Sequence, residues 1–211
     1  MIETPTGADQ PAVPQFFQAG SPPERLAWRA VAATKPGKPG GVWLGGFRSD
    51  MLSTKAQRLE DHARAAGRAF LRFDYSGHGE SGGDFAEGTI GLWARQSLDM
   101  IRGLTEGPQI LVGSSMGGWI ALLLARDMPD RIAGLIGIAA APDFTERMWE
   151  AEFTLAERTT LLEDGVFLRP SDYSDDPYPI TLRLIEDGRQ NLVMNGPLHL
   201  PFPVRLLQGS A

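Results

Sequence analysis

The chain has 211 residues, 42% of them hydrophobic and 22% charged, which is the composition of one globular domain. Its formal net charge of −6 and the lack of any Lys/Arg cluster argue against a nucleic-acid partner. Because it has no Cys and no run of about 18 apolar residues, we expect neither disulfides, a Cys-based metal site nor a membrane span. The Pro-rich segment 1–18 lacks the basic and apolar regions of a secretory signal, so a cytoplasmic location is expected.

Strand-like and helix-like segments alternate as far as Ala140, which is the pattern of an α/β sheet with helices on both faces. Apolar residues at helical spacing follow Thr89, a candidate N-cap, and Gly67 closes an earlier helical segment. Strands are predicted at residues 15–18, 26–33, 41–46, 69–75, 109–112, 132–140 and 204–209, and helices at 53–66, 90–104 and 116–126. The fold predicted is a mostly parallel sheet between two layers of helices.

Residues 77–82 (GHGESG) match the Gly-x-Gly-x-x-Gly pattern of dinucleotide sites. A phosphate site of that type needs a helix that opens at the last glycine, whereas residues 83–88 have the composition of a loop. We interpret the segment as a tight turn that Asp74 and Ser81 fix through side-chain hydrogen bonds to the backbone. Neither a Walker-A lysine motif nor a His-Glu-x-x-His pair occurs, so no nucleotide, metal or other cofactor is expected.

Residues 109–119 (QILVGSSMGGW) run from an apolar strand through Gly-x-Ser-x-Gly into a helix-forming segment. This order is typical of a nucleophile elbow, a strained strand-to-helix turn that exposes its central residue, here Ser115. Gly113 and Gly117 are the small neighbours that let the backbones pass closely. The helix that follows would direct its first N–H groups at the serine, so the N–H of Met116 is one expected oxyanion donor. The alternative is a glycine-rich turn with an inert serine.

Charged and aromatic residues without clean periodicity fill residues 142–201. Asp143 and Glu146 resemble a capping box that opens an amphipathic helix. We predict a core at 1–141, a helical cap at 142–201 that lies over the C-terminal ends of the strands, and a returning core strand within 202–211. Four aromatic residues are candidates for binding an apolar acyl group: Trp119, Phe144, Trp149 and Phe153. The alternatives are a plain pair of surface helices and ordinary core side chains.

The catalytic residues of this architecture follow the order Ser, then Asp or Glu, then His, with the acid after a strand that follows the cap. Both later positions would lie beyond Ala211. We therefore expect the C-terminal part of the core to be missing, whether the chain is a gene fragment, a truncation or a natural short form. His62 on a charged helix, His78 in a glycine turn and His199 before the final strand all stand in the wrong order to be the base.

Three segments carry a family resemblance: 41–55 (GVWLGGFRSDMLSTK), 72–82 (RFDYSGHGESG) and 107–119 (GPQILVGSSMGGW). They resemble the α/β-hydrolase superfamily and, more narrowly, the α/β-hydrolase-domain palmitoyl-protein thioesterases, which also act as acyl-glucuronide esterases. The resemblance implies an α/β-hydrolase fold that cleaves a carboxylic ester or acyl thioester through an acyl-enzyme on Ser115. It also implies that the N–H of Phe47 is the second oxyanion donor, although Gly45-Gly46 stand where many relatives have His-Gly.

The substrate implied by this resemblance is a small acyl ester or thioester, or an acylated protein, and no cofactor is implied. The residues alone leave another class of protein open, a non-catalytic fragment that binds small acyl ligands. An acid and a histidine encoded downstream of Ala211 would distinguish the enzyme from this alternative.

Overall fold

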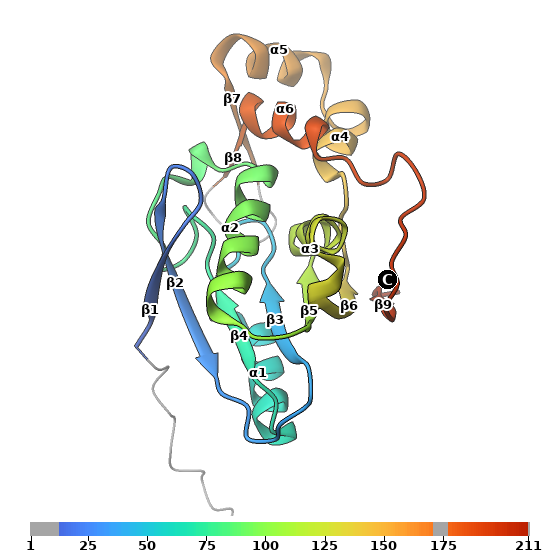
Figure 1. Cartoon of the computed structure of the whole chain (residues 1–211). Helices are drawn as coiled ribbons and strands as arrows, with labels where there is room; N and C mark the ends of the chain where they lie inside the picture. The colour runs from blue at the N-terminus through green and yellow to red at the C-terminus, as the bar shows by residue number, and fades with distance from the viewer. Residues whose placement is uncertain (1–12, 171–176, 211) are drawn as a thin grey trace, which may run out of the picture.

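A seven-stranded sheet forms the centre of the molecule in the computed structural model, which describes residues 13–170 and 177–210 (Figure 1). The strands lie in the order β1-β2-β4-β3-β5-β6-β9. Their bounds are Gln15–Ala19 (β1), Glu24–Val31 (β2), Gly40–Leu44 (β3), Phe70–Phe73 (β4), Gln109–Ser114 (β5), Ile132–Ile138 (β6) and Val204–Leu207 (β9). The elements between them are α1 (Thr54–Ala66), η1 (Phe85–Glu87), α2 (Ile90–Leu104), α3 (Met116–Asp127) and η2 (Pro129–Arg131).

The sheet is antiparallel at one edge and parallel elsewhere. β2 pairs antiparallel with both β1 and β4, whereas the pairs from β4 across to β9 are parallel. β4 and β5 lie on opposite sides of β3, so the strand order reverses there. Ligands of open α/β sheets bind beside such a reversal, outside the carboxyl ends of the strands. The loops that follow β3 and β5 carry Phe47 and Ser115, and they leave the sheet at this point.

Alternate residues of β3 join different cores, because successive side chains of a strand point to opposite faces of the sheet. Val42 and Leu44 pack in the larger core with residues of α2 and α3, whereas Trp43 packs with residues of α1. In Figure 1, α2 and α3 lie in front of the sheet and α1 lies behind it. The predicted sheet with helices on both faces is confirmed.

Two helix boundaries match the signals in the sequence. The side chain of Thr89 accepts a hydrogen bond from the N–H of Leu92 at 3.2 Å and caps α2, as predicted. Gly67 ends α1 with a φ of 70°, a left-handed conformation that glycine adopts without strain. The strand ends differ from the predicted ones by one or two residues.

A group of short elements lies over the C-terminal ends of the central strands, at the top of Figure 1. We call this group the cap. It consists of α4 (Phe144–Arg147), a π-helical turn (η3, Met148–Glu152), α5 (Leu155–Asp164), β7 (Val166–Arg169), β8 (Tyr178–Thr181) and α6 (Leu182–Gln190). The domain boundaries 1–141, 142–201 and 202–211 stay predictions, and residues 1–12, 171–176 and 211 lie outside the described part of the chain.

The predicted capping box at Asp143 and Glu146 is wrong. Asp143 has a left-handed φ of 54° and makes no side-chain bond to the start of α4. Its carboxylate instead accepts from the N–H groups of Val193 and Met194, at 2.9 and 2.8 Å, and so ties the chain after α6 to the start of the cap. The Asp143 carboxylate thus makes a long-range contact that the local spacing of residues does not reveal.

The cap also contains an antiparallel hairpin of β7 and β8, whereas the sequence predicts only helices there. Each of these strands has four residues, which is too short for the alternation of polar and apolar side chains to stand out. The capping box of the cap lies at the start of α5, where Thr154 and Glu157 cap each other's backbone N–H groups.

Candidate active site

Ser115 lies at a sharp turn between β5 and α3. Its φ of 52° and ψ of −118° are strained for a residue with a side chain, as the elbow motif predicts. The N–H of Ser115 donates to the C=O of Ile138 at 3.1 Å, and its C=O accepts from the N–H groups of Gly118 and Ala141 at 2.9 and 3.1 Å. These bonds tie the turn to the end of β6 and to the first turn of α3, so the serine backbone is held on both sides.

The glycines of the motif are required by close packing of the backbone. A Cβ at Gly113 would lie 2.3 Å from the C=O oxygen of Gly117, and a Cβ at Gly117 would lie 2.0 Å from that of Leu44. Both distances are far shorter than a van der Waals contact, so neither position accepts a larger residue without a shift of the backbone. The first turn of α3 can therefore approach the end of β3, which brings Ser115 beside the loop after β3.

A cavity of about 560 Å³ lies beside Ser115, between the sheet and the cap. The core contributes Phe47, Ser115, residues 139–142 and Gln208 to its lining. The cap contributes Phe144, Arg147, Met148, Glu152, Arg169, Pro170, Tyr178 and Ile180. The apolar and aromatic residues among them suit an acyl chain, and the position beside Ser115 suits its carbonyl group.

Phe144 is the one member of the predicted acyl-binding set that lines this cavity. Its ring packs at 5.9 Å from the ring of Phe47, measured between centroids. Trp119 packs against Phe144 at 5.6 Å between ring centroids and is fully buried, with its indole N–H donating to the C=O of Asn191 at 3.0 Å. Trp119 therefore joins α3 to the end of α6 and does not border the cavity.

Phe153 and Trp149 do not line the cavity either. Phe153 belongs to the apolar core of the cap and packs against Phe167 at 5.7 Å between ring centroids. Trp149 lies beneath the guanidinium groups of Arg158 and Arg189, which are 5.6 and 4.9 Å from its ring centroid. Trp149 lies in the π-helical turn η3 and Phe153 directly follows it, so a regular helical spacing does not predict where these side chains lie.

The two residues predicted to supply the oxyanion donors both lie near Ser115. Met116 is the first residue of α3, so its N–H has no acceptor within the helix. Phe47 lines the cavity, and the preceding Gly46 is so close to the elbow that a Cβ there would lie 3.5 Å from the Cβ of Ser115. Both residues therefore lie near Ser115, and their role as oxyanion donors stays a prediction.

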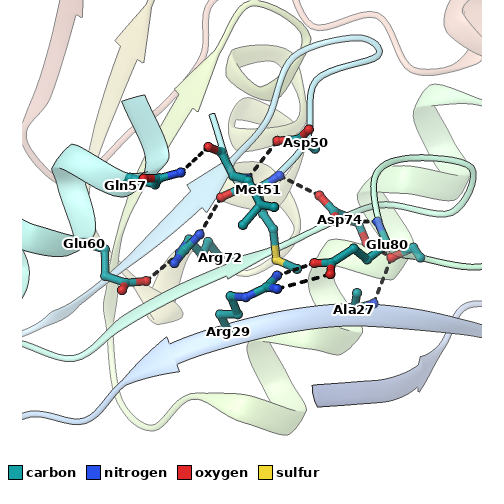
Figure 2. A network of polar contacts seen from close by, with 11 residues as sticks. Ala27, Arg29, Asp50, Met51, Gln57, Glu60, Arg72, Asp74 and Glu80 are labelled. Carbon is teal, nitrogen blue, oxygen red and sulfur yellow. Dashed lines mark hydrogen bonds and ion pairs between the residues drawn. The ribbon is translucent and has the colours of Figure 1, made fainter. Parts of the chain in front are cut away.

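The loop after β3 is fixed to β4 by buried polar groups (Figure 2). The Asp74 carboxylate accepts from the N–H of Met51 at 2.6 Å, and the Arg72 guanidinium donates to the C=O of Met51 at 2.8 Å. Arg72 also pairs with Glu60 of α1 at 2.5 Å, so its charge is compensated within the fold. Burial raises the pKa of Asp74 to about 6, although the N–H donors of Glu80 and Met51 act in the opposite direction.

Asp74 and Ser81 fix the glycine turn after β4, as predicted. Asp74 accepts from the N–H of Glu80 at 3.0 Å, and the Ser81 hydroxyl donates to the C=O of Asp74 at 2.7 Å. Ser81 also accepts from the N–H of Ala27 on β2 at 2.8 Å, and Glu80 pairs with Arg29 of the same strand. These bonds tie the turn to β2 and to the end of β4.

The three histidines lie in different parts of the fold. His62 is exposed on α1, and His199 lines a different cavity beside η2. His78 is buried, and both of its ring nitrogens are engaged, Nε2 with the N–H of Arg48 at 3.2 Å and Nδ1 with the C=O of Ser76 at 3.1 Å. Burial lowers the pKa of His78 to about 4. None of the histidines lines the Ser115 cavity, and that none of them is the base stays a prediction.

Glu152 is the one carboxylate in the described lining of the cavity. It accepts from Arg169 at 2.8 Å and from Arg147 at 3.0 Å. The hydrogen bond from Arg169, with that from Arg147, lowers its pKa, so it is ionised and paired rather than poised to take a proton. Arg147, Glu152 and Arg169 were not predicted as site residues, because residues spread over this stretch of the chain carry no local pattern that shows they meet.

The strand order, the sharp turn at Ser115 and the cavity beside it are features of the α/β-hydrolase fold, and a sequence comparison agrees. Residues 36–207 match the Alpha/beta hydrolase family, so the chain belongs to that family. Within it, the chain is similar to the palmitoyl-protein thioesterase ABHD10, mitochondrial, of Bos taurus, with 36% identity over 181 residues. That alignment covers 85% of this chain and 59% of the bovine protein, so the chain spans less than two thirds of this relative.

Solved structures show the same relationship. A putative hydrolase from Agrobacterium vitis S4 is 40% identical and superposes with a TM-score of 0.88, over 93% of this chain and 78% of that one. Mouse alpha/beta hydrolase domain-containing protein 10 is 33% identical, with a TM-score of 0.82 over 93% of this chain and 77% of the mouse chain. The predicted α/β-hydrolase fold and the resemblance to palmitoyl-protein thioesterases are confirmed.

Two further observations concern the described residues alone. None of their helices combines the length and apolar character needed to cross a membrane. No group of three or more His, Asp or Glu side chains among them is arranged to hold a metal ion.

Proposed function

We propose that this chain carries the nucleophile and the oxyanion site of a serine hydrolase that cleaves carboxylic esters or acyl thioesters. The observation that carries the proposal is the strained backbone of Ser115 at the mouth of a cavity lined by Phe47, Phe144 and Tyr178. A strained residue persists only where the surrounding structure holds it, and such strain is typical of catalytic turns. The relationship to palmitoyl-protein thioesterase ABHD10 supports an acyl substrate.

In the proposed reaction, the Ser115 hydroxyl attacks the carbonyl carbon of the substrate and its proton passes to a base. The tetrahedral oxyanion that forms would accept from the N–H groups of Met116 and Phe47, and loss of one such donor typically costs about 2.7 to 4 kcal/mol in the transition state. The acyl-enzyme on Ser115 forms as the alcohol or thiol leaves with a proton, and water then releases the acid. The substrate is a small acyl ester or thioester, or an acylated protein.

The base and its acid partner are proposed to come from residues C-terminal to Ala211. Two observations support this: His78 has both ring nitrogens engaged by backbone groups, and the chain covers only 59% of the bovine relative. A serine without a positioned base keeps only the contribution of binding and oxyanion donors, about a thousandfold or more below a complete triad.

One observation favours a second function, a protein that binds acyl ligands without turning them over. No described histidine reaches the Ser115 cavity. In that case a medium-chain fatty acid would bind in the cavity, and neither the 211-residue chain nor a longer form from the same gene would hydrolyse an ester.

The proposal is tested by measuring turnover of p-nitrophenyl esters and of an acyl thioester by the 211-residue chain and by a C-terminally extended form from the encoding gene. We expect turnover by the extended form, its abolition by Ser115→Ala and its retention by the neighbouring Ser114→Ala. Turnover that survives Ser115→Ala would refute the nucleophile, and the absence of turnover in both forms would favour the binding protein.

A further inference from the structure

The loop of residues 45–51, which carries Phe47, must hold an unusual backbone conformation. Arg48, the residue after the proposed oxyanion donor, has a left-handed φ of 56°. This conformation is uncommon for a residue with a side chain and typically costs about 1 kcal/mol or more. Such a conformation persists only where other contacts fix the neighbouring peptide groups. The hydrogen-bond partners of the N–H groups in this loop therefore determine the direction of the Phe47 N–H.

His78 accepts a hydrogen bond from the backbone N–H of Arg48. Its Nε2 lies 3.2 Å from that nitrogen, and its Nδ1 lies 3.1 Å from the C=O oxygen of Ser76. A backbone N–H can only donate and a C=O can only accept, so the ring is neutral, with its proton on Nδ1 and a lone pair on Nε2. The indole N–H of Trp93 donates to the same C=O at 3.2 Å, which fixes the acceptor in turn.

Packing leaves the imidazole of His78 little freedom to move. The side chain is 3% exposed, and its ring centroid lies 5.0 Å from those of both Phe85 and Trp93. The ring of Phe47 packs on the same two residues, at 4.8 and 6.0 Å. The imidazole and the side chain of Phe47 therefore pack against the same two rings, and the hydrogen bond from the Arg48 N–H joins the imidazole to the backbone next to Phe47.

We propose that His78 is a positioning residue for the oxyanion site: by accepting the Arg48 N–H it holds the preceding residue, Phe47, with its N–H beside Ser115. The catalytic part of this proposal rests on the proposed function. The glycine turn after β4, whose sequence matches the Gly-x-Gly-x-x-Gly pattern, thus holds the loop after β3 in place through His78. His78 takes no proton in the reaction and touches no substrate.

Three variants separate this role from general stability. His78→Leu keeps an apolar side chain of similar size but removes the acceptor. His78→Gln can place an amide oxygen near the position of Nε2 and restores the acceptor. Ser97→Ala is the matched control, because the buried Ser97 hydroxyl donates to the C=O of Trp93 at 2.7 Å behind the same aromatic cluster and makes no bond to the loop of residues 45–51.

The first measurement is amide hydrogen exchange at Arg48, resolved by NMR in the 211-residue chain. It does not require catalysis. We expect exchange in His78→Leu to be about tenfold faster than in the unaltered chain, since a hydrogen bond is worth about 1 to 1.5 kcal/mol, and expect Gln to restore protection. Ser97→Ala should leave this amide unchanged. Equal protection in His78→Leu and the unaltered chain would overturn the proposal.

The second measurement is the kinetics of ester hydrolysis, made in whichever of the two forms compared above is active. His78→Leu should lower kcat by about 10- to 100-fold with little change in KM, because an oxyanion donor acts mainly in the transition state. His78→Gln should recover kcat to within a few fold. An unchanged kcat in His78→Leu, or a Gln variant as slow as Leu, would overturn the positioning role. If no form is active, the proposed function fails, while exchange at Arg48 still decides whether His78 holds the loop.

Discussion

Gly117 leaves no room for a side chain, since a Cβ there would lie 2.0 Å from the C=O oxygen of Leu44. We predict that Gly117→Ala lowers the free energy of unfolding by about 2 kcal/mol or more, because backbone atoms and not flexible side chains must move. Gly196→Ala is the control, since nothing lies within 4 Å of its Cβ position, and it should change stability by less than about 0.5 kcal/mol. Urea unfolding of the two variants checks this, and equal stabilities would contradict the packing described for the elbow.

The buried imidazole of His78 also leads us to predict how the stability of the fold depends on pH. Its pKa is about 4 in the folded chain, because of burial, and 6.5 in the reference state, so the unfolded chain takes up a proton first as pH falls. His78 therefore destabilises the fold progressively between about pH 6.5 and pH 4, by up to about 3 kcal/mol. Asp74, whose pKa burial raises to about 6, contributes with the opposite sign in the same range.

The difference between the unaltered chain and His78→Gln isolates the histidine, because Asp74 titrates in both proteins. We expect the stability of the unaltered chain relative to His78→Gln to be constant above about pH 7.5 and to fall as pH decreases toward about 4.5. Urea unfolding across this range measures it. A difference that is independent of pH would show that His78 is not held neutral in the fold.

At the residue level, the sequence predicts the elbow well, because its requirements are local. A glycine on each side of Ser115 and a strand before it suffice to identify the turn. The aromatic residues of the acyl site are harder to predict. Trp119 and Phe153 are as apolar as Phe144, and only packing decides that they fill the core while Phe144 borders the cavity.

Elements with long periodic patterns could be predicted from the sequence, whereas the short elements of the cap could not. α2 shows helical spacing over 15 residues with a capping threonine. The four-residue strands β7 and β8 and the π-helical turn η3 give no such pattern. The Thr154-x-x-Glu157 sequence is a better capping-box signal than the pair at Asp143, and it could have marked the start of α5.

The positions of Phe144 and Trp149 in the cap lead us to predict how each residue affects turnover of esters with different acyl-chain lengths. Phe144 lines the cavity beside Ser115, whereas Trp149 lies against two arginines outside it. We predict that Phe144→Ala in the active form reduces turnover of a medium-chain ester more than that of an acetyl ester, since each methylene that loses apolar contact costs about 0.8 kcal/mol. Trp149→Ala should affect both esters equally, and a larger effect of Trp149→Ala on the longer ester would reverse the two assignments.

At the scale of the whole molecule, one edge of the sheet is exposed. Among the described strands, β9 pairs with β6 alone, and its Leu206 and Leu207 are 72% and 56% exposed. An exposed apolar edge strand is a template for pairing with another chain. We predict concentration-dependent association of the 211-residue chain, seen by light scattering, and a lower association in Leu206→Lys. Equal association in the variant would show that β9 is not the contact.

The cytoplasmic location stays a prediction.

The central claim is that Ser115 is the nucleophile of this hydrolase fold. The most direct test is to treat the extended form with a fluorophosphonate probe, which reacts with activated serines, and to locate the adduct by peptide mass spectrometry. We predict one adduct on Ser115, absent in Ser115→Ala and retained in Ser114→Ala. An adduct that persists at full yield in Ser115→Ala would contradict the account.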